Sequence, residues 1–120
     1  MDKRDAIIRV EGLTTHYGSR RILNDINLEI QPRETMVLLG SSGTGKSTLL
    51  RHILALEKPT SGHIYIKSMD VCHSPEEQLN ELRRHMGVLF QSGALFGSMS
   101  LGDNVALPLR ELTKLDESTI

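Results

Sequence analysis

Residues 40–47 of this chain form the glycine-rich stretch Gly40-Ser41-Ser42-Gly43-Thr44-Gly45-Lys46-Ser47. It satisfies every fixed position of the pattern G-x-x-x-x-G-K-[ST], whose glycines let successive backbone N–H groups converge on phosphate oxygens. Lys46 is expected to reach the β- and γ-phosphates of a nucleotide, and Ser47 to ligate Mg²⁺ through its hydroxyl. At average residue frequencies, a chance match in such a chain has odds of about a few in a thousand. The stretch therefore predicts a nucleotide-binding loop.

The segments on either side of this loop favour the same fold. Residues 35–39 form a run without polar alternation, typical of a strand buried on both faces of a parallel sheet. From Lys46 onward the apolar residues Leu49, Ile53 and Leu56 follow helical spacing, so a helix is expected to begin at the loop. Its N-terminus would direct about half a positive charge at the phosphate. This order predicts the α/β core of a P-loop NTPase.

The rest of the chain predicts short strands and two further helices. Strands are expected at residues 8–11, 26–30, 63–67 and 88–90. The first two alternate apolar and polar residues, which indicates an antiparallel β subdomain, and residues 14–20 are expected to form a turn. Ser74 and Ser100 are expected to cap helices, and Pro108 to kink or stop the second of them.

Composition excludes several classes of function. The 120 residues suffice for one domain or part of one. Fourteen Lys+Arg against fifteen Asp+Glu give a formal charge of −1, which argues against nucleic-acid binding. The longest purely apolar run, Met36-Val37-Leu38-Leu39, is far shorter than the ~20 residues of a spanning helix, so no direct membrane insertion is expected. The charged N-terminus predicts no signal peptide.

The cysteine and the histidines suggest no further chemistry. Cys72 is the single cysteine and is expected to be a free cytosolic thiol. His52 and His85 lie on predicted helices near cationic neighbours, where we expect them to be solvated. No set of His, Cys and carboxylate residues shows the spacing of a metal site.

Three separated segments resemble the ATP-binding subunits of ABC transporters, and they follow one another in that family's order. Tyr17 lies 23 residues before Gly40, where the family places an aromatic residue that stacks on adenine. Gln91 lies 45 residues after Lys46 and resembles the Q-loop glutamine, which reaches Mg²⁺ and the attacking water. The resemblance runs from residue 8 to about residue 112.

The resemblance assigns roles to individual residues. ATP binding falls to Tyr17, Gly40, Ser41, Ser42, Gly43, Thr44, Gly45, Lys46, Ser47 and Thr48. Lys46 and Gln91 are the expected catalytic residues, and Ser47 and Gln91 the expected Mg²⁺ ligands. The implied partners are a transmembrane permease subunit and a second ATPase subunit, and the implied location is the cytoplasmic face of the inner membrane, through the permease.

A narrower resemblance concerns the transported substrate. Residues 89–96, LFQSGALF, and residues 104–111, NVALPLRE, are similar to the ATPase of Mla/Mce-type transporters. Those transporters move phospholipid between the membranes of diderm bacteria. Amino-acid and metal importers share the looser pattern, so an importer of another substrate stays open.

Two turns depart from the family's pattern. Pro32-Arg33-Glu34 stands where the family has Pro-Gly-Glu. A type I turn is expected here, because a positive φ at Arg33 would be unfavourable. Lys67-Ser68-Met69-Asp70 stands where an Asp-Gly hairpin turn is expected.

The signature motif, the Walker B aspartate, the catalytic glutamate and the switch histidine of the family have no counterpart in this chain. We therefore interpret it as the N-terminal portion of a nucleotide-binding domain, truncated before the second half. Residues 1 to about 91 would form the β subdomain and P-loop core, and about 92–120 would begin the helical subdomain. The alternative is a non-catalytic nucleotide-binding fragment, expected not to hydrolyse ATP alone. A small P-loop kinase or GTPase fits less well, because it predicts no Tyr17 and Gln91 pair.

Overall fold

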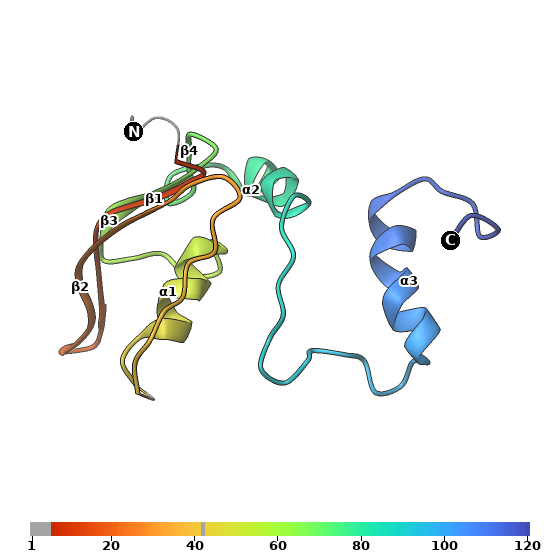
Figure 1. Ribbon diagram of the computed structural model, residues 1–120, viewed down its shortest axis with the longest axis horizontal. Coiled ribbons are helices and arrows are strands. Elements are labelled where there is room, and N and C mark those ends of the chain that lie inside the picture. The colour runs from red at the N-terminus through yellow and green to blue at the C-terminus, as the bar shows by residue number, and fades with distance from the viewer. Residues whose placement is uncertain (1–5, 42) are drawn as a thin grey trace. The chain divides into compact units, whose positions relative to one another are not determined.

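The computed structural model describes residues 6–41 and 43–120. It divides into two compact units, residues 1–80 and 81–120, which are described separately below. Along the chain the elements are β1 Ile8–Tyr17, β2 Arg20–Ile30, α1 Lys46–Ile53, β3 Ser61–Ile66, β4 Met69–Asp70, α2 Glu76–Arg83 and α3 Leu101–Leu112 (Figure 1). Helix α2 spans the division between the two units.

The first unit is built on a four-stranded antiparallel sheet in the order β2-β1-β3-β4. Ile8 of β1 pairs with Ile30 of β2 on one side and with Ile66 of β3 on the other. The predicted strands at 8–11, 26–30 and 63–67 are confirmed. The predicted turn over 14–20 is too long, because β1 continues to Tyr17 and leaves only two residues between the strands.

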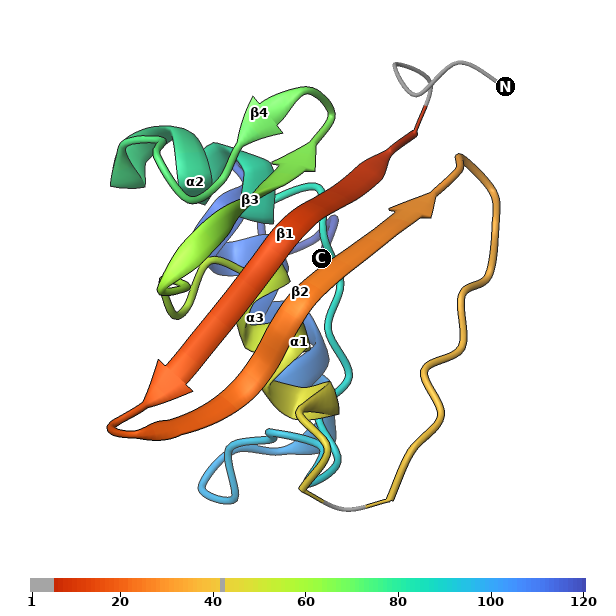
Figure 2. The same cartoon turned by 90° about the vertical axis from the view of Figure 1, so that its left-hand side faces the viewer.

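Helix α1 lies against one face of this sheet (Figure 2). Because successive side chains of a strand point to opposite faces of the sheet, every second residue of β1 and β3 points toward the face that α1 covers. The buried apolar residues of this unit are Val10, Leu13, Leu23, Leu49, Leu54, Ile64, Ile66, Val71 and Leu79. Leu13 and Ile64 are fully inaccessible, which places the centre of the core where β1 and β3 run side by side.

Two predicted buried strands, residues 35–39 and 88–90, are absent. Both segments are irregular, and their apolar side chains are exposed, with Leu39 91% and Leu89 87% accessible. A central strand forms only when neighbouring strands satisfy its N–H and C=O groups and cover its two faces. Within the described residues no strand pairs with either segment. The prediction of a buried strand at each of these two segments is therefore wrong.

The two unusual turns both use positive φ without glycine. Arg33 has φ 64°, and the Glu34 N–H donates to the Gln31 carbonyl at 3.1 Å. Proline followed by a positive φ is the geometry of a type II turn, so the predicted type I turn is wrong. At the β3–β4 turn Lys67 and Ser68 both have positive φ, which is the type I′ hairpin geometry that Asp-Gly normally provides.

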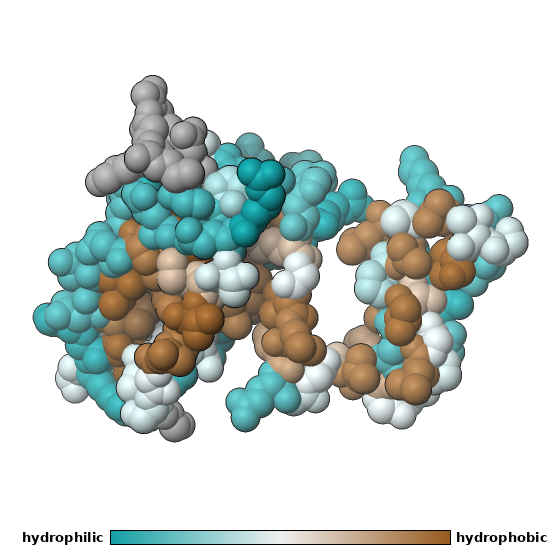
Figure 3. Space-filling view, in the orientation of Figure 1, coloured by the Kyte–Doolittle hydropathy of each residue, from teal (hydrophilic) through white to brown (hydrophobic). Residues whose placement is uncertain are grey.

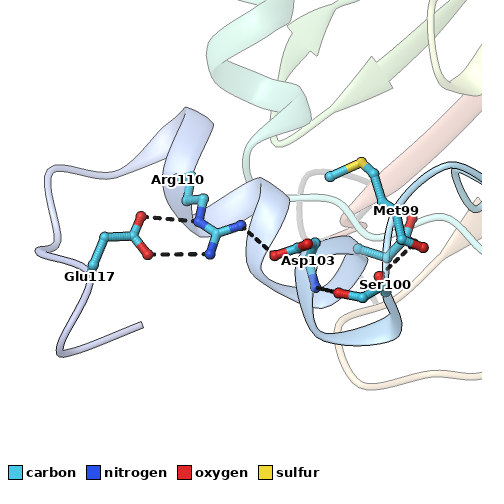
Figure 4. Close-up of polar contacts among 6 residues, drawn as sticks. Met99, Ser100, Asp103, Arg110 and Glu117 are labelled. Carbon is cyan, nitrogen blue, oxygen red and sulfur yellow. Dashed lines mark hydrogen bonds and ion pairs between the residues drawn. The ribbon is translucent and has the colours of Figure 1, made fainter.

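In the second unit, α3 continues through Pro108. Of the two expected effects of this proline, a stop is therefore wrong, and a kink stays a prediction. The Ser100 cap is confirmed, because its Oγ accepts from the Asp103 N–H at 3.0 Å. Arg110 donates to Asp103 at 3.1 Å and forms two hydrogen bonds with Glu117, at 3.0 and 3.2 Å (Figure 4). These contacts tie the first turn of α3 to its last turn and to the segment beyond it.

Apolar side chains gather on the surface of α3 (Figure 3). Leu101 and Val105 are each 76% exposed, and the helix buries none of its residues. Among the described residues no helix is long and apolar enough to cross a membrane.

Candidate nucleotide site

The glycine loop, residues 40–45, leads directly into α1, as predicted. The Lys46 side chain folds back over this loop. Its ammonium donates to the carbonyl oxygens of Gly40 and Ser41, the latter at 2.8 Å. The Thr44 hydroxyl donates to the same Ser41 carbonyl at 2.8 Å. The lysine and the loop backbone thus form one hydrogen-bonded unit, with the cation at its centre.

Two glycines of the loop are required by its backbone. Gly43 has φ 84° and Gly45 has φ 95°, in the region that residues with a Cβ rarely adopt. A Cβ at Gly45 would also lie 2.8 Å from Leu23 Cδ2 and 3.2 Å from the Ile22 carbonyl oxygen, both on β2. The start of α1 therefore packs directly on the sheet, which fixes the loop relative to β2. Ser42 lies outside the described residues.

The first turn of α1 is suited to binding an anion. The residue before it, Gly45, offers no side-chain cap, and no acidic residue lies in the first turn. N–H groups at a helix N-terminus lack partners within the helix, and they favour negative charge. Ser47 is exposed at this end, whereas Thr48 is buried and its Oγ1 accepts from Arg51 at 3.2 Å.

Tyr17, the predicted adenine-stacking residue, forms a hydrogen-bonded cluster with Arg51 and Glu57 that was not predicted from the sequence. The Tyr17 hydroxyl donates to Glu57 Oε2 at 2.6 Å, and Arg51 donates to Glu57 Oε1 at 2.8 Å and to the Tyr17 oxygen at 3.4 Å. Tyr17 remains 44% exposed. Arg51 lies five residues after Lys46 on α1, or about 7.5 Å of helix rise. The aromatic ring and the glycine loop are thus both attached to the same helix.

This cluster perturbs two titratable groups. The hydrogen bond from Tyr17 lowers the pKa of Glu57, and Arg51 adds to the effect against the opposing influence of burial. The hydrogen bonds to Tyr17 and Glu57 raise the pKa of Arg51. Both groups are therefore held in their charged forms.

Gln91 belongs to the second unit, where it is exposed in a turn closed by a hydrogen bond from the Gly93 N–H to the Phe90 carbonyl at 2.9 Å. Its assignment to Mg²⁺ and to catalysis stays a prediction.

The histidines differ from expectation at two places. His52 is buried, 1% exposed, and its ring nitrogens lie 2.7 Å from Thr15 Oγ1 and 3.0 Å from the Glu57 carbonyl oxygen, so the prediction of a solvated residue is wrong. His85 is exposed, as predicted.

The expectation that the chain has no metal-type cluster is wrong, because His63, Asp70 and His73 bring their ligand atoms within 4.8 Å of one another. Cys72 is a free thiol.

The sequence profile of the ABC transporter family matches residues 23–119, most of the chain and all of the glycine loop. This chain belongs to the ABC transporter family. A probable ribonucleotide transport ATP-binding protein of Mycobacterium leprae is 51% identical over 113 residues, which are 94% of this chain and 33% of that protein. The intermembrane phospholipid transport ATP-binding protein MlaF of Haemophilus influenzae is 42% identical over 95% of this chain and 43% of its own length.

Solved ABC transporter cassettes share the fold. A dimeric bacterial cassette superposes with a TM-score of 0.84 at 31% identity, over 93% of this chain and 51% of that chain. The ABC ATPase fold inferred from the sequence is thereby confirmed. The chain spans about a third to a half of the length of these relatives.

The residues present fit ATP and Mg²⁺, which this family generally requires. The Lys46 ammonium lies at the loop carbonyls of Gly40 and Ser41, where it supplies a positive charge for a phosphate group. Ser47 offers an exposed hydroxyl oxygen, and Mg²⁺ prefers such oxygen ligands.

Proposed function

We propose that this chain forms the ATP-binding part of an ABC transporter subunit that energises phospholipid transport. The observation that carries the proposal is the glycine loop at the start of α1, with the Lys46 ammonium hydrogen-bonded to the loop carbonyls. A cation in that position can exchange those carbonyls for the β- and γ-phosphate oxygens of ATP. The uncapped N–H groups of α1 would face the same phosphates.

The other site residues would hold the two ends of the nucleotide. Tyr17 would stack on the adenine ring, an interaction worth about 1–3 kcal/mol per base in nucleic-acid complexes. Ser47 and Gln91 would hold Mg²⁺, which supplies charge neutralisation between the β- and γ-phosphates. Gln91 would also orient the attacking water, and Lys46 would stabilise the charge of the transferred phosphoryl group. Hydrolysis is proposed for the whole subunit.

An ATP titration of the 120-residue chain tests the nucleotide site. Lys46→Ala removes a charged hydrogen-bond donor, worth about 1.5–3 kcal/mol, so ATP should bind about 10- to 150-fold more weakly. Lys114→Ala, at an exposed lysine of the second unit, is the matched control and should leave affinity unchanged. Equal affinities of Lys46→Ala and the control would show that the loop does not bind the phosphates.

The proposed role of Gln91 has a separate test. In a full-length subunit, Gln91→Ala should leave ATP affinity largely intact while it reduces transport-coupled hydrolysis. If that variant lost ATP binding as severely as Lys46→Ala, the assignment of Gln91 to the γ-phosphate would be wrong.

Phospholipid is the proposed cargo because of the likeness of residues 89–96 and 104–111 to Mla/Mce-type ATPases, supported by the identity to MlaF. Other relatives carry other names: ribonucleotide transport in Mycobacterium, and methionine import in Vibrio vulnificus at 45% identity over 88% of this chain. The test uses the full subunit with its permease in vesicles. ATP should drive transfer of a labelled phospholipid between vesicle populations, whereas uptake of a ribonucleotide or methionine instead would reject phospholipid.

The proposed partners are a transmembrane permease and a second ATPase subunit, at the cytoplasmic face of the inner membrane. The exposed apolar residues of α3, Leu101 and Val105 among them, suit a surface that a permease helix covers. The solved relative named above is dimeric, which supports a paired subunit. Co-purification with the permease, and its loss in Leu101→Asp, would test this surface.

A further inference from the structure

His63, Asp70 and His73 form a cluster on the first unit that the nucleotide site does not use. His63 lies on β3, Asp70 ends β4, and His73 follows in the next turn. His63 Nδ1 donates to Asp70 Oδ2 at 3.0 Å, and His73 Nδ1 donates to the same oxygen at 2.8 Å. The two imidazole centroids lie 5.1 Å apart. Three potential ligand atoms thus converge on one point.

The backbone holds these three residues in place. The hairpin register sets Asp70 opposite Tyr65, two residues from His63 on the same face of β3. Asp70 Oδ1 accepts from the Cys72 N–H at 3.1 Å, which turns Oδ2 toward the histidines. The His73 N–H and the Ser74 hydroxyl both donate to the Asp70 carbonyl, at 3.2 and 2.6 Å, and close the turn that brings His73 back over Asp70. Each ligand is therefore positioned by contacts other than those within the cluster.

From this arrangement we propose that His63, Asp70 and His73 bind one Zn²⁺ ion. Zn²⁺ takes imidazole nitrogen and carboxylate oxygen at about 2.0–2.2 Å, so neighbouring ligand atoms of a tetrahedral site lie about 3.3 Å apart. The two observed separations of 2.8 and 3.0 Å are close to this value, and small side-chain rotations would open the cluster around an ion. Both histidines bind as neutral imidazoles through Nδ1, and each then carries its proton on Nε2.

The site would be accessible and would keep one position open. The side chains of His63 and His73 are 46% and 64% exposed, so an ion can enter without unfolding the sheet. A hollow beside them is lined by residues that include Ser61, Gly62 and Cys72. It leaves room for a water as fourth ligand. Two nitrogens and one carboxylate favour Zn²⁺ over Mg²⁺, which prefers oxygen ligands alone, so this ion is distinct from the one proposed at Ser47.

The test is a metal titration of the metal-free 120-residue chain. Zn²⁺ affinity is measured by competition with a chromogenic chelator, and Co²⁺ is added as a spectroscopic probe of coordination. We expect one Zn²⁺ per chain, not displaced by excess Mg²⁺, and the intense visible absorption of a four-coordinate Co²⁺ ion. His63→Ala and His73→Ala should each weaken Zn²⁺ binding at least tenfold.

His85→Ala is the matched control, because His85 is an exposed histidine of the second unit, and it should bind Zn²⁺ as the parent does. Lys46→Ala should also retain Zn²⁺, which separates this site from the nucleotide site. Equal affinities of the parent, His63→Ala and His73→Ala would overturn the proposal. Absence of binding at a tenfold excess of Zn²⁺ would overturn it as well.

Discussion

Replacing His52 with alanine should destabilise the first unit strongly, because this histidine joins the sheet to α1. His52 is 1% exposed, and its ring connects Thr15 on β1, itself 3% exposed, with the Glu57 carbonyl. The change leaves the buried Thr15 Oγ1 without its partner, at about 1–3 kcal/mol before any cavity term, and removes a part-buried bond to the Glu57 carbonyl. The total free energy of unfolding of a natural domain is about 5–15 kcal/mol, so this loss is a large part of it.

The assay is urea unfolding of the 120-residue chain followed by far-ultraviolet circular dichroism. His85→Ala, at an exposed histidine, should stay within about 0.5 kcal/mol of the parent. The double variant Thr15→Val/His52→Leu should lose less free energy of unfolding than the two single variants added together, because each single change leaves the other residue's polar atom buried without a partner. A His52→Ala chain as stable as His85→Ala, or strictly additive losses, would refute the role of this pair.

Three further outcomes follow from the turn, the irregular segment and the tyrosine cluster. Arg33→Gly should raise the free energy of unfolding by about 1 kcal/mol, because it relieves a positive φ, and a decrease in the same urea assay would contradict the type II turn. Leu39→Lys should change stability by less than about 0.5 kcal/mol, since Leu39 is exposed, whereas a loss of several kcal/mol would indicate a buried strand. The lowered pKa of Glu57 gives stability that is present above pH 4.5, its ordinary pKa, and is lost as the pH falls below that value. The melting temperature of Glu57→Gln should therefore fall less than that of the parent between pH 7 and pH 4, and parallel curves would count against the cluster.

The loop and the helix after it could be predicted from the sequence because their causes are local. Gly43 and Gly45 supply the required dihedrals, and the apolar spacing from Leu49 onward sets the helix. The capping pattern at Ser100 is local in the same sense, since its partner lies three residues away. Features of this kind depend on neighbours along the chain, which a sequence displays directly.

Features that depend on pairing between distant segments were missed. The burial of His52 requires Thr15, 37 residues away, and the histidine cluster requires a hairpin register that brings His63 to Asp70. Residues 35–39 illustrate the opposite error. Their apolar character indicates where burial is favourable, but a strand needs a partner, and in the described part of the chain none pairs with them.

Helix α1 serves the core and the proposed site at once, and this restricts how the two can vary. Its successive residues point in different directions, so Leu49 and His52 enter the core while Arg51 reaches Tyr17 and Lys46 reaches the glycine loop. The spacing between the aromatic ring and the loop is therefore set by the helix and not by flexible chain. A substitution in the core contacts of α1 lowers the apparent ATP affinity because it lowers the fraction of the chain that is folded. A substitution at Lys46 lowers the ATP affinity of the folded chain. When the measured affinity is corrected for the fraction of folded chain, the loss caused by a core substitution should disappear and the loss caused by Lys46→Ala should remain.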